Sequence, residues 1–184
     1  MAGLIASDVL SRFGAATLQY WNSRLVLGLP GIPRTGASVP ASRLPRSGFI
    51  ESVHVTINHA HVPFALDTGA AFSVVDPQIA AQSKLRTIGR SGRIGGATGC
   101  QVPETPVALN AWELGSIKLP TALVLKINST QSLGRLHVDG ILGSDVLSAF
   151  KNVTLNYLQH RVQLSGAMHR QPPTTPRRRG SREP

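Results

Sequence analysis

A single carboxylate set between two apolar segments is the feature that most limits how this 184-residue chain can fold. Residues 64–76 read FALDTGAAFSVVD, so the apolar residues 64–66 and 72–75 flank Asp67, Thr68 and Gly69. Burying a charge without a partner is costly. Asp67 therefore lies either at an exposed turn or at a site that needs a carboxylate in low-dielectric surroundings.

The tripeptide Asp67-Thr68-Gly69 by itself is typical of a turn, because Asp accepts backbone hydrogen bonds and Gly tolerates a positive φ. Its surroundings favour a different interpretation. Turns usually separate polar strand ends, whereas both flanking segments here are apolar. A carboxylate between two core strands is expected to be functional or paired.

The rest of the middle of the chain predicts a mainly β fold. The 18 glycines and 13 prolines of the whole chain favour many short elements joined by turns. Strands are expected at 49–57 and 62–66, two or three more within 104–127, and a closing hairpin at 152–164. A short helix is expected at 76–85, with Asp76 as N-cap and Pro77 in the first turn. Residues 138–150 predict an apolar strand, a glycine turn and a second short helix.

The two ends differ from the middle. Residues 1–23 predict an amphipathic helix, and a transit peptide, a bacterial leader and a packing helix are all compatible with that pattern. Residues 28–48 are rich in Gly, Pro and Ser and indicate a linker or extended arm. From Gln171 onward Pro and Arg dominate, which predicts disorder. The expected organisation is an N-terminal extension (1–47), one domain (48–166) and a basic tail (167–184).

Charge and composition make some classes of function less compatible with this sequence than others. The net charge of +10 belongs mostly to the ends, with +4 in residues 1–47, +4 in 170–184 and only +2 between them. A nucleic-acid-binding domain should carry its basic patch on the fold itself, so this class is disfavoured. No apolar run reaches 18 residues, and the single Cys100 cannot form an intrachain disulfide. These features favour the cytoplasm and leave membrane association open.

The segment FALDTGAAFSVVD resembles the catalytic loop of aspartic proteases, and VDGILGSDVL at 138–147 resembles the second hallmark of that family. A glycine-rich stretch lies between them, where the family carries its flap. Order and spacing are similar to the single-domain retroviral-type (retropepsin-like) aspartic proteases, including their bacterial relatives. The resemblance covers residues 48–166. It implies a closed β-barrel, or acid-protease half-domain, with one or two short helices and a flap hairpin.

The resemblance also implies a mechanism. Two carboxylates about 3 Å apart share one proton, and together they activate water and protonate the leaving amide. The chain has one Asp-Thr-Gly, so a C2 homodimer is expected to bring two Asp67 side chains together. Thr68 would hydrogen-bond across the axis, and Gly69 would donate its amide to the carboxylate. Ala70 resembles the small residue beside the cleft, and Ile141, Leu142 and Gly143 would thread beneath the loop.

Several residues have competing interpretations. The stretch GRSGRIGGATG at 89–99 would be the flap, with Gly95, Gly96 and Ala97 against the substrate, or an ordinary glycine-rich surface loop. Asp139 could be read as a second catalytic aspartate, but its place just before Ile141 favours a surface or turn residue. His59 and His61 have no partners at ligand spacing, so neither a metal site nor any cofactor is expected.

The sequence therefore predicts an aspartic endopeptidase, active as a homodimer on peptide or protein substrates. The alternative is a dimerisation or peptide-binding module of the same fold with little or no hydrolysis. A basic-tailed nucleic-acid binder is a third and weaker reading. Residues 1–47 could be a propeptide, a membrane-surface helix or a dimer arm.

Overall fold

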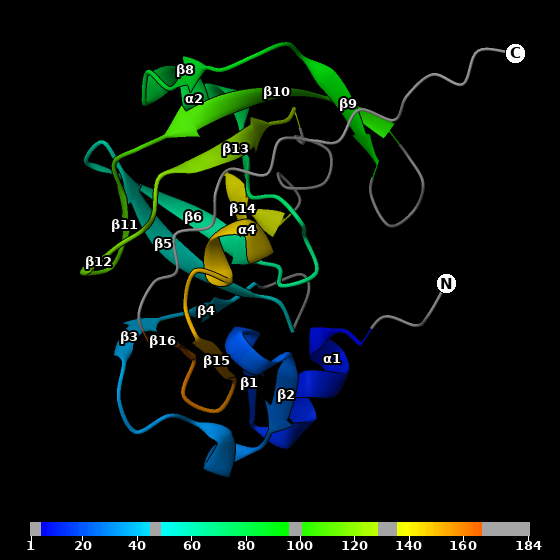
Figure 1. Cartoon of the computed structure of the whole chain (residues 1–184), viewed down its shortest axis with the longest axis vertical. Helices are drawn as coiled ribbons and strands as arrows, with labels where there is room; N and C mark the ends of the chain where they lie inside the picture. The colour runs from blue at the N-terminus through cyan, green and yellow to red at the C-terminus, as the bar shows by residue number, and fades with distance from the viewer. Residues whose placement is uncertain (1–4, 45–48, 96–100, 129–135, 167–184) are drawn as a thin grey trace, which may run out of the picture.

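The computed structural model describes residues 5–44, 49–95, 101–128 and 136–166, and these fold into two β-sheets with a few short helices (Figure 1). The tail from residue 167, predicted to be disordered, lies outside these residues, as do residues 45–48. Within the described residues, the helices are α1 (Ser7–Leu10), α2 (Pro77–Gln82) and α4 (Ser144–Leu147), with 3-10 turns η1 (Ser11–Phe13), η2 (Tyr20–Asn22) and η3 (Leu29–Gly31).

The larger sheet has 11 strands, in the order β12-β11-β5-β6-β14-β7-β13-β10-β8, with β4 added on β5 and β9 on β10. Its strands are β4 (Ser42–Arg43), β5 (Glu51–Ile57), β6 (Ala60–Leu66), β7 (Val74–Val75), β8 (Arg86–Thr87), β9 (Gly92–Gly95), β10 (Gln101–Leu109), β11 (Trp112–Leu114), β12 (Ile117–Lys118), β13 (Ala122–Lys126) and β14 (Gly140–Leu142). The path ends at β12 and β8 without joining them, so the expectation of a closed barrel is wrong. The two-residue end strands offer too little backbone for closure.

The smaller sheet has five strands in the order β2-β1-β15-β16-β3 and lies below the larger one in Figure 1. Its strands are β1 (Ala15–Gln19), β2 (Arg24–Leu27), β3 (Ala37–Pro40), β15 (Asn152–Asn156) and β16 (Arg161–Ser165). The predicted closing hairpin is confirmed as β15 and β16. The N-terminal strands extend this hairpin on both sides, because β1 pairs with β15 and β3 pairs with β16.

The helix predicted for the N-terminal segment is wrong. Where a helix was expected over 1–23, only the four residues of α1 are α-helical within the described part of that range, and β1 follows after η1. Of the two expectations for residues 28–48, the extended arm fits better than the linker, because β3 and β4 pair with β16 and β5. The apolar spacing predicted a helix with one buried face, but most of these apolar residues, such as Ile5, Phe13 and Trp21, are exposed in the structure. Pairing with distant strands overrides such a local pattern.

One hydrophobic cluster runs through both sheets. Ala16 and Val39 from the N-terminal strands and Val153 from the closing hairpin belong to the same buried cluster as Phe64 and Leu142 of the larger sheet. The core thus does not begin at residue 48. Residues 5–44 contribute to the interior that supports the rest of the chain.

The region 104–127, expected to hold two or three strands, holds four, β10 to β13, because two of them are only two or three residues long. The predicted hairpin and helix start nearer the loop are confirmed. Strands β5 and β6 form the expected hairpin, and Asn58 and His59 at its turn both have positive φ. Helix α2 begins as predicted, because the Asp76 carboxylate accepts a hydrogen bond from the Gln78 amide at 2.7 Å. None of the helices in the described ranges is long and apolar enough to cross a membrane.

Candidate active site

The loop that carries Asp67 joins β6 to β7 and is closed by its own hydrogen bonds. The Gly69 amide donates to Asp67 Oδ1 at 2.9 Å, and the Ala70 amide donates to the Asp67 carbonyl at 3.1 Å. The loop thus holds one carboxylate oxygen by a backbone N–H. In the single chain Asp67 and Gly69 are exposed, although the strands on both sides are buried.

Strand β14 lies between β6 and β7 and so passes directly beneath this loop. It runs parallel to β6, with Leu142 opposite Leu66, and antiparallel to β7, with Ile141 opposite Val74. The Leu142 carbonyl accepts the Asp67 amide at 3.1 Å. Residues 141 and 142 thus pair with both flanks of the loop, and the site role expected for residues 141–143 stays a prediction.

At Gly143, directly after β14, the backbone packs closely against the loop. A Cβ at this position would lie 2.9 Å from the Ala70 carbonyl oxygen and 2.9 Å from the Phe72 carbonyl carbon and oxygen. Any side chain would push these backbone atoms away. The glycine therefore allows the loop and the start of α4 to pack together, and the Ser144 amide donates to the Ala70 carbonyl at 2.8 Å.

This arrangement can be compared with known proteins. The sequence profile of an aspartyl protease family matches residues 53–146, which include the Asp67 loop and β14. The chain belongs to this aspartyl protease family.

Two solved structures are also similar to the chain. A retropepsin-like aspartic protease from Rickettsia conorii is 18% identical, with a TM-score of 0.49, over 72% of this chain and 100% of that one. The retroviral protease-like domain of Ddi1 from Leishmania major is 22% identical, with a TM-score of 0.31, over 51% of this chain and 71% of that one. No curated protein matches the sequence.

In this aspartyl protease family member, Thr68 faces the N-terminal segment. Thr68 is half-buried and lines a hollow of about 330 Å³ whose other walls come from residues 5–25, among them Ile5, Tyr20 and Leu25. The roles assigned from the sequence to Asp67, Thr68, Gly69 and Ala70 stay predictions, as does the cross-axis bond of Thr68.

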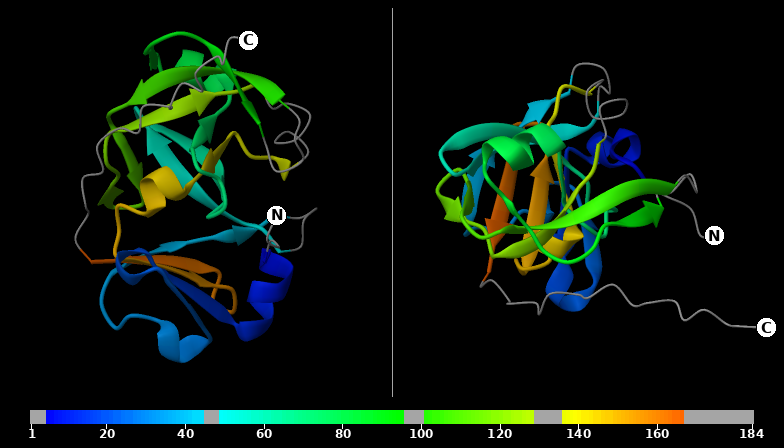
Figure 2. Two further views of the ribbon diagram at one scale, coloured as in Figure 1. Left: turned by 45° about the vertical axis from the view of Figure 1, so that its right-hand side comes forward. Right: turned by 90° about the horizontal axis from the view of Figure 1, so that it is seen from above.

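The expected flap coincides with the hairpin of β9 and β10, which extends beyond the rest of the larger sheet (Figures 1 and 2). Gly95 lies at the end of β9 and is exposed, whereas Gly96 and Ala97 lie outside the described residues. Arg93 donates from Nη2 to the Gln101 carbonyl at 2.9 Å, across the hairpin. Arg93 thus stabilises the hairpin itself.

Asp139 lies at the opposite end of β14 from the loop. Its amide donates to the Pro63 carbonyl at 2.9 Å and its carbonyl accepts the Asp76 amide at 2.8 Å. A strand rises about 3.3 Å per residue, which places Asp139 about 10 Å from Leu142. Burial, and then the nearby Asp76 charge, raise the pKa of Asp139. This position agrees with its assignment as a residue outside the carboxylate pair.

Sequence reasoning missed two polar residues that support the loop from below. Ser73 is fully buried, and it donates to the Asp145 carboxylate from its amide at 2.9 Å and from its hydroxyl at 2.7 Å. The Gly143 amide in turn donates to Ser73 Oγ at 3.0 Å. Burial raises the pKa of Asp145, and the hydrogen bonds from Ser73 partly oppose this. The available signal was a lone serine within the apolar run at 72–75.

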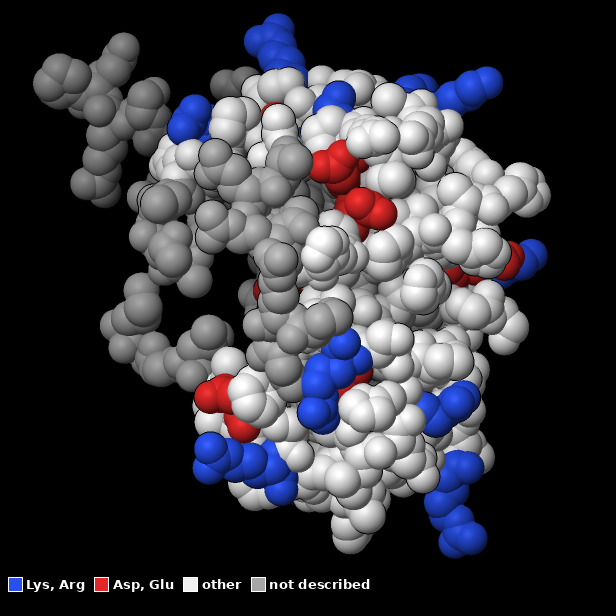
Figure 3. All heavy atoms as spheres, turned by 180° about the vertical axis from the view of Figure 1, so that it is seen from behind, with Lys and Arg blue, Asp and Glu red and all other residues white. Residues whose placement is uncertain are grey.

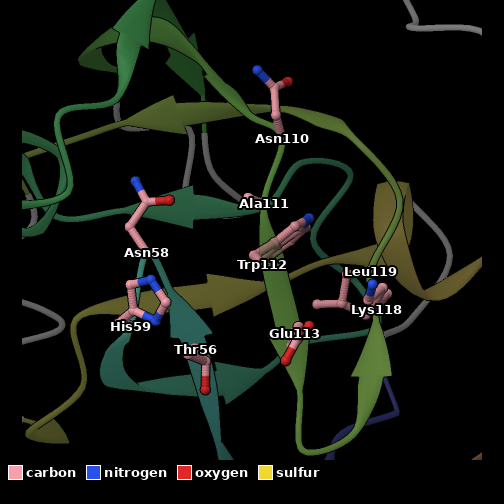
Figure 4. A pocket seen from close by; sticks show the side chains of 9 residues that line it. All are labelled: Thr56, Asn58, His59, Asn110, Ala111, Trp112, Glu113, Lys118 and Leu119. Atoms are coloured by element: carbon pink, nitrogen blue, oxygen red, sulfur yellow. The ribbon is translucent and has the colours of Figure 1, made fainter.

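A second hollow, of about 380 Å³, lies on the far side of the larger sheet from β9 (Figures 1 and 4). Its walls come from β5, β11, β12 and the turn with Asn58 and His59, and it contains no residue of the Asp67 loop. Across the described ranges, no three His, Cys, Asp or Glu side chains are grouped as metal ligands.

On the face in Figure 3, the described Lys and Arg side chains are spread apart and Asp and Glu lie between them. The described residues of this face form no single basic stripe of the kind that tracks a nucleic-acid backbone. The exclusion of nucleic acid as a partner remains a prediction.

Proposed function

We propose that this protein is an aspartic endopeptidase that hydrolyses peptide bonds with a water-activating pair of Asp67 carboxylates from two copies of the chain. The observation that carries the proposal is the Asp67 loop itself. It holds an exposed carboxylate by the Gly69 amide at 2.9 Å, over a strand that crosses beneath it. One carboxylate cannot be both base and acid in the same step, whereas a pair sharing one proton can.

The second carboxylate is assigned to another copy because the other aspartates near the loop are engaged elsewhere. Asp145 accepts two hydrogen bonds from Ser73, and Asp139 lies at the far end of β14. A homodimer would supply the missing group by symmetry. It would also cover Asp67, which the single chain leaves exposed.

The surface beside the loop supports docking of a second copy. Ile5 and Leu25 line the hollow that Thr68 also lines, and their exposed fractions are 63% and 46%. Trp21, in the same segment, is 61% exposed. Exposed apolar groups of this size commonly mark protein interfaces.

The test is cleavage of a peptide library between about pH 4 and pH 7, a range that brackets titration of a shared-proton carboxylate pair. Wild type should cleave, Asp67→Asn should not, and the matched variant Asp139→Asn should retain cleavage. Sedimentation should show dimers for wild type and for Asp67→Asn. Dimers of wild type without cleavage would favour the binding-module alternative.

A mixing experiment tests whether both carboxylates are needed. After subunit exchange with an equal amount of Asp67→Asn chain, about half of the wild-type chains should sit in mixed dimers. The activity per wild-type chain should then fall to about half. Unchanged activity would mean that one Asp67 suffices, and the shared-proton mechanism would be rejected.

A further inference from the structure

A chain of hydrogen bonds leads from the N-terminal segment to the peptide group between Thr68 and Gly69. Ser144 Oγ donates to the Thr68 carbonyl at 2.5 Å, and Tyr20 Oη lies 3.3 Å from the same Ser144 oxygen. A carbonyl can only accept, so Ser144 uses its one hydroxyl proton on Thr68. Tyr20 is therefore the donor to Ser144.

The opposite side of that peptide group holds Asp67. The Gly69 amide belongs to the same planar unit as the Thr68 carbonyl, and it donates to Asp67 Oδ1 at 2.9 Å. Hydrogen bonds in a chain polarise one another, so a carbonyl that accepts a strong bond makes its N–H a better donor. The three bonds thus point in one direction, from Tyr20 toward the carboxylate.

We propose that Ser144 and Tyr20 are positioning residues that orient the Asp67 carboxylate by fixing and polarising the Thr68–Gly69 peptide group. This inference rests on the proposed function, because it assigns the two residues a role in that same reaction. It also gives residues 5–44 a part in the site. The sequence had left this segment as a propeptide, a membrane-surface helix or a dimer arm.

Both residues are held in place by their own elements. The Tyr20 amide donates to the Lys151 carbonyl at 2.9 Å, just after β1 leaves the small sheet. Ser144 begins α4, and its amide donates to the Ala70 carbonyl at 2.8 Å, which ties the helix start to the loop. Burial raises the pKa of Tyr20, so its hydroxyl stays protonated and remains a donor.

The test uses the full-length chain and the variants Ser144→Ala and Tyr20→Phe. The exchange rate of the Gly69 amide proton with water, measured by NMR, reports its bond to Asp67. One hydrogen bond corresponds to roughly a fivefold change. We expect exchange about fivefold faster in Ser144→Ala and a smaller acceleration in Tyr20→Phe. The kcat of peptide cleavage should fall by a similar factor with KM unchanged, because orientation of a reacting group acts on the chemical step.

Two further variants complete the design. Tyr157→Phe is the matched control, since the Tyr157 hydroxyl meets Ser7 Oγ at 3.5 Å and is no part of the chain to Thr68. It should change neither readout. Ser144→Thr keeps the hydroxyl and should restore both the Gly69 exchange rate and kcat to their wild-type values. If Ser144→Ala does not fold, Tyr20→Phe still tests the proposal.

The outcomes separate the two proposals. Unchanged Gly69 exchange in both Ser144→Ala and Tyr20→Phe would overturn the positioning role, whatever the activity. Faster exchange with an inactive wild-type dimer would support the hydrogen-bond chain and reject the peptidase. Faster exchange with unaltered kcat would show that the chain is structural only, and the positioning role would be withdrawn.

Discussion

Ser73 and Asp145, which are 72 residues apart in the sequence, are joined by two hydrogen bonds, one from the Ser73 amide at 2.9 Å and one from its hydroxyl at 2.7 Å. The Ser73 hydroxyl also accepts the Gly143 amide at 3.0 Å. One small side chain thus links the strand after the Asp67 loop to the start of α4. Asp145 is thereby a structural support for the loop.

Ser73→Ala should lower the free energy of unfolding by about 2 kcal/mol, because the partly buried Asp145 carboxylate and the buried Gly143 amide both lose the Ser73 hydroxyl as a partner. Urea unfolding measures this. Ser91→Ala is the control, since the exposed Ser91 hydroxyl meets only Thr105, and it should change stability by less than about 0.5 kcal/mol. Equal effects in both variants would contradict the supporting role of Ser73.

Asp145→Asn should remove a pH dependence of stability. Burial raises the pKa of Asp145 in the folded chain, so the folded state binds a proton more tightly than the unfolded state. Stability from this group is therefore greatest in acid and declines as the pH rises through the folded pKa. The difference in unfolding free energy between wild type and Asp145→Asn should fall as the pH rises above about 3.9, the ordinary pKa of Asp in an unfolded chain. A constant difference would refute the shift.

Thr17→Val should lower the free energy of unfolding by about 1 to 3 kcal/mol. The substitution removes Thr17 Oγ1, which lies 2.9 Å from the Thr154 hydroxyl, and so leaves that buried hydroxyl without its hydrogen-bond partner. The double variant Thr17→Val, Thr154→Val should be much closer to wild type, since neither hydroxyl remains. Additive losses in urea unfolding would mean that β1 does not lie beside β15.

Gly143→Ala should destabilise the fold by about 1 to 3 kcal/mol, because the new Cβ would meet loop backbone at 2.9 Å. Gly95→Ala is the matched control, since no heavy atom of the described residues lies within 4 Å of its added Cβ. Thermal unfolding of the two variants compares them directly. If Gly143→Ala is as stable as Gly95→Ala, the close approach of β14 to the loop is wrong.

Leu25→Asn should raise the dissociation constant of the proposed dimer by about tenfold or more, because this exposed leucine lies at the hollow beside Thr68. Sedimentation at several concentrations gives the constant. Leu158→Asn changes a leucine that is 65% exposed and lies outside that hollow, and it should leave association unaltered. Equal weakening by both would argue against this surface as the interface.

Local features of the site could be predicted from the sequence because they lie within short windows. The apolar flanks of Asp67, the Asp76 cap of α2 and the glycine after Ile141-Leu142 each have a signature of a few residues. These signatures underlie the predicted hairpin, helix start and apolar strand before Gly143, all of which the structure contains. The flap tip lies outside the described residues and stays a prediction.

The remaining features depend on approaches between residues far apart in the chain. Tyr20 reaches Ser144 across 124 positions, and Thr17 reaches Thr154 across 137. Nothing in the periodicity near Tyr20 or Thr17 signals such a partner, and the apolar spacing there favoured a helix. Strand β1 gains its stability from hydrogen bonding on both sides, which only the assembled sheet provides.

The position of β1 between β2 and β15 has a consequence for how the protein is made. During synthesis β1 and β2 emerge before β15, and an isolated pair of strands is marginal in water. The second partner of β1, β15, is translated more than 130 residues after β1. Closing so long a loop costs entropy and slows folding. Strand β1 therefore lacks the hydrogen bonds on one of its two sides until β15 has been synthesised.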